Sequence, residues 1–219
     1  MNKVMEFLEE LAKNNNREWF QENKKWYEES RDKFLFLTDV MINEIRKFDP
    51  EMPALSPKDC MFRIFRDVRF SNDKRPYKTN FGSYISKGGR KGMYAGYYFH
   101  ISPEESFTGG GLYMPPAEPL KAVREHIAEN ADEFLEIIDQ PEFKKMYPEM
   151  YDDKLKTAPK GFPKDHEHID LLRYKSYVFS HSFSREDIVG EKYIGQMVSA
   201  FHVLQPFNRF LNEAIEKIS

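Results

Sequence analysis

The first fifty residues carry apolar side chains at helical spacing. Positions 4, 7, 8 and 11 are apolar, which is typical of a short amphipathic helix. The asparagine run at 14–16 ends this helix, and Asn16 can cap the next one. The helical pattern then continues to 48 and stops before Pro50. The sequence therefore predicts a helical arm over 1–49.

From Cys60 the apolar pattern changes to a period of two, and aromatic and β-branched residues become frequent. This pattern is typical of β-strands. The predicted strands span 60–70, 80–87, 93–102 and 106–113. The glycine-rich stretch "GGRKG" at 88–92 suits a hairpin connection. We therefore expect an antiparallel meander over 58–114.

The remainder, 115–219, is predicted to be helical with one further strand at 174–183. Ser184 with Asp187 three positions later resembles a helix start, and Pro206 is expected to interrupt the last helix. The order of elements predicts a single α+β domain over 1–219. In it an antiparallel sheet has helices packed against one face, between an N-terminal helical arm and a C-terminal helix.

Composition indicates a folded protein inside the cell. The chain has 219 residues, of which 40% are hydrophobic and 15% aromatic, enough for a large core. Glu6 and two further glutamates interrupt the apolar pattern of the N-terminus, which argues against a signal peptide, and no apolar stretch approaches the length of a membrane span. The single Cys60 suits a reducing compartment. We expect a cytoplasmic protein that does not bind membranes.

The charge is unevenly distributed along the chain. The net charge is −3, but 58–91 contains ten cationic and three anionic residues, a local charge of +7. The remaining residues therefore sum to −10. A positive surface on an acidic body can steer an anionic ligand.

The stretch "RIFRDVRFSNDKRPYKTNFG" at 63–82 holds most of these cations. If 60–70 is a strand, alternation places Arg66 on the same face as five apolar or nearly apolar residues. An arginine there requires a carboxylate partner or a ligand, because desolvating an unpaired charge is costly. After the strand, Pro76 stiffens a loop that carries further cations.

These residues leave three interpretations open. In the first, a pocket binds a small ligand bearing phosphate or carboxylate, and the sequence does not decide whether that ligand is transformed. The residues of this pocket would be Arg63, Arg66, Arg69, Lys74, Tyr77 and Lys78. In the second, the cations form a structural ion-pair network. In the third, which the negative net charge disfavours, a basic sheet face with nearby tyrosines docks nucleic acid or an acidic protein. The oligomeric state is not defined by the sequence.

Other signals are weaker. "TGGG" at 108–111 favours a bulge or a turn over an anion site, and His100 favours a hydrogen-bonded sheet residue. Cys60 is expected to be an unreactive core residue. "DHEH" at 165–168 lacks the spacing of metal ligands, so neither a metal nor a cofactor is predicted.

Three motifs together resemble a known family. They are the arginine-rich stretch at 63–82, "GGGLYMPPAEPLKAVREHI" and "LKTAPKGFPKDHEHIDLLRYKS", and the opening "FLEELAKNNNREWFQENKKWYEE" is similar too. The chain resembles a family of bacterial and fungal proteins known only as a domain of unknown function. The resemblance covers nearly the whole chain and implies one complete domain, but it implies no activity.

Overall fold

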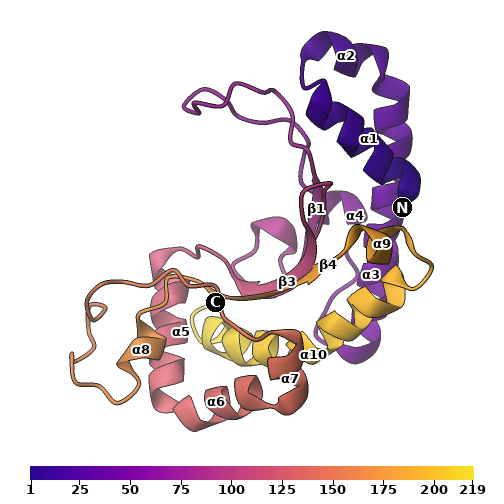
Figure 1. The fold of residues 1–219 in the computed structure, drawn as a ribbon. Coiled ribbons are helices and arrows are strands. Elements are labelled where there is room, and N and C mark those ends of the chain that lie inside the picture. Colours follow the sequence, from indigo (N-terminus) through magenta and orange to yellow (C-terminus); the bar gives the residue numbers. More distant parts are fainter.

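Helices from both ends of the chain cover one face of a four-stranded antiparallel sheet (Figure 1). A computed structural model describes all of residues 1–219. The architecture is α+β, as the sequence predicts. No helix combines the length and apolar character needed to cross a bilayer.

The helical arm consists of α1 (Asn2–Lys13), α2 (Arg17–Glu22) and α3 (Lys24–Phe48). Asn16 caps α2 as predicted, because its side-chain oxygen accepts the Trp19 backbone N–H at 2.9 Å. The apolar side of α1 is fully buried, and α3 ends two residues before Pro50.

The sheet contains β1 (Phe81–Ile85), β2 (Gly96–Ile101), β3 (Ser106–Leu112) and β4 (Tyr177–Phe183), in that order across it. A short 3₁₀ helix, η1 (Gly89–Lys91), lies in the glycine-rich connection between β1 and β2. These strands confirm three of the four strands predicted for the meander and the further strand predicted at 174–183.

The predicted strand at 60–70 is wrong. After α4 (Pro57–Cys60), the chain makes isolated bridges at Met61 and Phe65 only. The segment folds back on itself, because the Arg66 N–H donates to Pro76 O and the Lys78 N–H donates to Ile64 O, at 2.9 and 2.8 Å. Residues 61–80, here called the basic loop, therefore form a long irregular hairpin that projects beyond the sheet (Figure 1).

The second half of the chain is mainly helical. Its helices are α5 (Ala117–Glu129), α6 (Ala131–Asp139), α7 (Pro141–Met146), α8 (Ile169–Leu172), α9 (Arg185–Val189) and α10 (Tyr193–Glu216). Ser184 and Asp187 form the predicted capping interaction at the start of α9. The expected interruption at Pro206 is wrong, since α10 continues through it. Leu204 and Phe207 are fully buried on either side of this exposed proline, so packing holds the helix.

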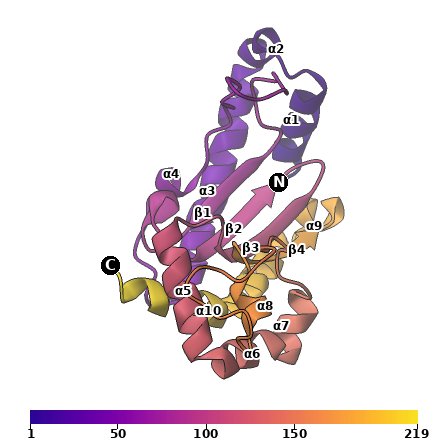
Figure 2. The same cartoon turned by 90° about the vertical axis from the view of Figure 1, so that its left-hand side faces the viewer.

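The two faces of the sheet differ in burial. Tyr97, Phe99 and Ile101 of β2 are 0% exposed and belong to one contiguous core cluster of 42 residues. The alternate residues Tyr98 and His100 point to the other side and are only partly buried. We call this side, away from α3 and α10, the open face. In Figure 2, β1 and β2 present it to the viewer with α3 behind them.

Candidate anion-binding site

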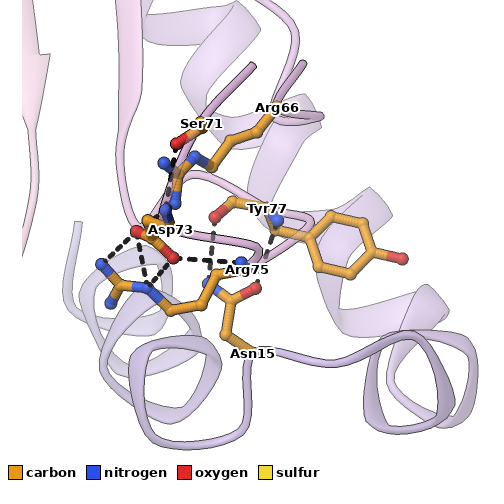
Figure 3. Close-up of polar contacts among 6 residues, drawn as sticks. All are labelled: Asn15, Arg66, Ser71, Asp73, Arg75 and Tyr77. Carbon is orange, nitrogen blue, oxygen red and sulfur yellow. Dashed lines mark hydrogen bonds and ion pairs between the residues drawn. The ribbon is translucent and has the colours of Figure 1, made fainter. Parts of the chain in front are cut away.

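The basic loop is fixed to the helical arm through Tyr77. The Asn15 side chain accepts the Tyr77 N–H at 3.1 Å and donates to the Tyr77 carbonyl oxygen at 3.0 Å. The Tyr77 ring, 4% exposed, stacks on Phe20 with centroids 3.9 Å apart. In Figure 3 this ring points away from Arg66 and Asp73. Tyr77, predicted as a residue of the ligand pocket, therefore lies with its ring apart from Arg66 and Asp73 and anchors the loop.

Arg66 has a carboxylate partner within the loop. Its Nη1 donates to Asp73 Oδ2 at 2.5 Å, and Arg75 binds the same carboxylate through Nε at 3.0 Å and Nη2 at 2.7 Å (Figure 3). Hydrogen bonds from Arg75 and then Arg66 hold the pKa of Asp73 well below its usual value. Arg66 thus belongs to an internal ion-pair network at the tip of the loop.

Two more predicted ligand residues also have partners at the tip. Arg69 donates to both oxygens of Asp67, at 2.9 and 2.6 Å, and this contact lowers the pKa of Asp67. Lys74 Nζ donates to the Val68 carbonyl oxygen at 3.0 Å. The tip of the loop is therefore organised largely by its own charges.

The base of the loop is different. Arg63, Lys78 and Arg90, here called the base cluster, have no carboxylate oxygen within 4.0 Å, and Arg90 Nε donates to the Asp59 carbonyl oxygen at 3.1 Å. Lys78 Nζ and Arg90 Cζ lie 5.6 and 5.8 Å from the centre of the same Phe62 ring. Burial, followed by the charges of Arg63 and Arg90, lowers the pKa of Lys78. The structure thus brings together two of the predicted ligand residues and adds Arg90.

A hydrogen-bonded tyrosine and histidine lie beside the base cluster on the open face. The Tyr98 hydroxyl is 3.0 Å from His100 Nδ1, and the Asn80 side-chain nitrogen is 3.4 Å from it. Both neighbours can donate, so Nδ1 is the acceptor and the neutral ring carries its proton on Nε2. No protein atom pairs with Nε2. The Phe62 ring lies 6.1 Å from that of Tyr98 and links the pair to the cations.

Burial and packing fix this pair in place. A Cβ atom at Gly82 would lie 2.6 Å from the Tyr98 hydroxyl, so only glycine at 82 lets the hydroxyl reach His100. The His100 ring stacks on Phe107 with centroids 4.9 Å apart. Burial lowers the pKa of His100 to about 4, which the charge of Lys78 also favours and that of Glu105 opposes. His100 is therefore neutral at pH 7.

The comparisons with known proteins identify the family. Residues 3–210 match the conserved hypothetical protein family DUF2461. The chain belongs to this family. No curated protein and no solved structure matches the chain. The family covers the basic loop, the open face and all four strands, so the candidate site lies within the family region.

Apart from His100, the weaker candidates of the DUF2461 chain lie outside the candidate site. Cys60 is 0% exposed, and burial together with Asp59 raises the pKa of its thiol to about 11, as expected of a core cysteine. The glycines at 109–111 lie within β3, inside the strand predicted at 106–113, and form no turn. The chain brings together no group of three His, Cys, Asp or Glu side chains that could hold a metal ion.

Arg90, Tyr98 and Asn80 are absent from the site predicted from the sequence. Arg90 follows the glycines of the β1–β2 connection, so its distance from Phe62 depends on how the hairpin closes. Tyr98 and His100 are two positions apart in a predicted strand, and this spacing is the one signal in the sequence that they share a face.

Proposed function

We propose that the base cluster binds a small anionic ligand that carries phosphate or carboxylate. The strongest support is the environment of Lys78. This cation is partly buried beside Arg63 and Arg90, and none of the three has a carboxylate partner. Charges removed from water are normally paired, because desolvation costs more than an unpaired group can recover. A bound anion would supply the missing partner.

The residue types also suit such a ligand. The guanidinium groups of Arg63 and Arg90 can each form two parallel hydrogen bonds with a carboxylate or phosphate, whereas Lys78 supplies a compact charge. The −10 charge of the chain outside 58–91 leaves the basic loop and its surroundings as the most positive segment. An anion is therefore steered toward this end of the molecule.

Thermal unfolding with added anions tests the proposal. Wild type, Lys78→Met and Lys91→Met are compared with inorganic phosphate, pyrophosphate and malonate, each at low and high salt. Lys91 is an exposed cation of the same segment, so its variant controls for the loss of one charge. A ligand at about 100 times its Kd should add about 2.7 kcal/mol to the stability of wild type.

We expect one of these anions to stabilise wild type and Lys91→Met but not Lys78→Met. Without ligand, Lys78→Met should unfold at the wild-type temperature or above it. The reason is that the folded-state pKa of Lys78 is lowered, so its charge opposes folding at every pH below that value. Equal stabilisation of all three proteins, or of none, would contradict the proposal.

A second candidate function is supported by the tip of the basic loop. Phe70 is 96% exposed, with the Arg69 guanidinium 5.9 Å from its ring centre. An exposed ring among cations suits stacking on the bases of single-stranded nucleic acid, which is worth about 1 to 3 kcal/mol per base. In a titration with a short single-stranded oligonucleotide, this function predicts a steep loss of affinity with salt and weaker binding by Phe70→Ala. An affinity that changes neither with salt concentration nor in Phe70→Ala would exclude this second function.

A further inference from the structure

The environment of Lys78 lowers the pKa of its amine. The side chain is partly buried, with Nζ 5.6 Å from the centre of the Phe62 ring, and after burial the positive charges of Arg63 and Arg90 lower its pKa further. An amine next to other cations and away from water is a better nucleophile at neutral pH, because more of it is deprotonated. The Lys78 backbone N–H donates to Ile64 O, which fixes the position of the backbone that carries this side chain.

Other lysines of the same segment lack this environment. Lys87 is bonded to the carboxylates of Glu51 and Glu216, which raise its pKa. Lys74 is exposed and donates to a carbonyl oxygen, and Lys91 is exposed. Lys78 is therefore distinguished within the segment by its position and not by residue type alone.

His100 and Tyr98, two side chains that can exchange protons, lie close to Lys78. The charge of Lys78 acts on His100, whose Nε2–H has no acceptor in the protein, while Tyr98 donates to Nδ1. Glu105 is the other charge that acts on His100. Asn80, two residues after Lys78, binds the same imidazole nitrogen and joins the two parts of the site.

We propose that Lys78 is a nucleophile that forms an imine with an anionic carbonyl compound, such as an oxo acid or a phosphorylated aldehyde. This inference rests on the proposed function, since Arg63 and Arg90 would hold the carboxylate or phosphate of that compound. The amine, the anion-binding cations and the neutral imidazole then serve one substrate.

The step needs no further reagent. The nitrogen lone pair of Lys78 attacks the carbonyl carbon, and the electron pair of the C=O bond moves to oxygen. That oxygen receives the two protons that the nitrogen loses and leaves as water, so the amine and the carbonyl give an imine and one water. His100 Nε2–H is available to donate a hydrogen bond to the departing oxygen.

Reductive trapping tests this inference directly. The protein is incubated at pH 7.5 with glyoxylate, pyruvate or pyridoxal 5′-phosphate as anionic probes, or with propionaldehyde as a neutral one. Sodium cyanoborohydride then reduces any imine, and peptide mass mapping locates it. We expect Lys78 to be modified at least tenfold more than Lys91 by an anionic probe, and inorganic phosphate to suppress this modification.

Two variants sharpen the test. Lys78→Arg keeps the positive charge and should lose the adduct while keeping stabilisation by phosphate. Arg90→Met should reduce modification of Lys78 by the anionic probes more strongly than that by propionaldehyde, since both reactions lose the effect of Arg90 on the pKa of Lys78 and only the first also loses an anion contact. Equal modification of Lys78 by the neutral and anionic probes in wild type would overturn the assignment of an anionic substrate.

The two proposals can fail separately. If phosphate stabilises wild type but not Lys78→Met, and Lys78 is no more modified than Lys91, the imine inference is overturned and anion binding stands. If Lys78 is modified selectively yet neither phosphate nor another anion stabilises or competes, the anion site is overturned, and the anionic substrate class with it.

Discussion

Arg66 shows how one carboxylate decides the role of an arginine. Its position in the sequence is equally consistent with a ligand contact and with an ion pair, and Asp73 seven residues later supplies the pair. Lys78 lies two residues after Pro76, whose carbonyl oxygen accepts the Arg66 N–H, and it has no such carboxylate. The candidate site is therefore defined by which cations of the loop remain unpaired.

Asp73 should keep the tip of the loop ordered down to acidic pH. Its pKa is lowered in the folded state, so its contribution to stability is complete above the unfolded value near 3.8 and is lost as the pH falls through the folded value. In Asp73→Asn, amide hydrogen exchange of Arg66 and Lys78 should be faster at neutral pH, because both arginine contacts weaken.

Asp67→Asn is the matched control for this prediction. Asp67 has one partner, Arg69, whose side chain is 76% exposed, so exchange of the same amides should hardly change. Equal exchange rates in wild type and Asp73→Asn would show that the network does not hold the loop.

His100 should titrate far below an ordinary histidine. Its pKa of about 4 means that between pH 6.5 and 4 the unfolded chain binds a proton that the folded chain does not. The free energy of unfolding should therefore fall as the pH is lowered through this window. Ring resonances followed by NMR give the pKa of His100 directly. Lys78→Met should raise it by removing a nearby cation, and a value near 6.5 in wild type would contradict the burial argument.

At the scale of elements, periodic patterns predicted most of the fold but not the basic loop. The helical arm and β1 to β4 follow from apolar spacing that matches burial on one face. The 60–70 segment also alternates, yet only Met61 and Phe62 pair with β1, and residues 64–66 pair with 76–78 instead. Alternation of apolar and polar residues indicates an extended chain with one apolar and one polar face, but it does not identify the segment with which that chain pairs. The pairing of the cations, and with it the site, depends on that segment.

The packing of α10 on β3 depends on Gly110. A Cβ atom there would lie 2.3 Å from Leu204 Cδ2 and 2.4 Å from the Gly96 carbonyl oxygen. The backbone oxygen cannot move aside easily, so Gly110→Ala should destabilise the protein by about 1 to 3 kcal/mol in urea unfolding. Gly195→Ala on α10 is the control, because nothing lies within 4 Å of its Cβ position. This variant should gain up to about 1 kcal/mol from helix propensity, and equal effects of the two would refute the packing argument.

At the scale of the whole molecule, one core joins all parts of the chain. Phe7 of the arm, Phe99 of the sheet and Phe201 of α10 belong to the same cluster of 42 buried residues. The chain should therefore unfold in one cooperative transition, with near- and far-ultraviolet circular dichroism changing together. Two separate transitions would instead indicate that the helical arm is an independent unit.

The contact between Asn15 and Tyr77 has a consequence for the order of folding. The two residues are 62 positions apart, and the strands β1 to β3 form from segments much closer in sequence. Contacts distant along the chain are slower to close, since more chain entropy is lost before they form. The basic loop should therefore become ordered only after the arm has docked. During refolding, the capacity to bind an anion should return with the slowest phase, later than the sheet itself.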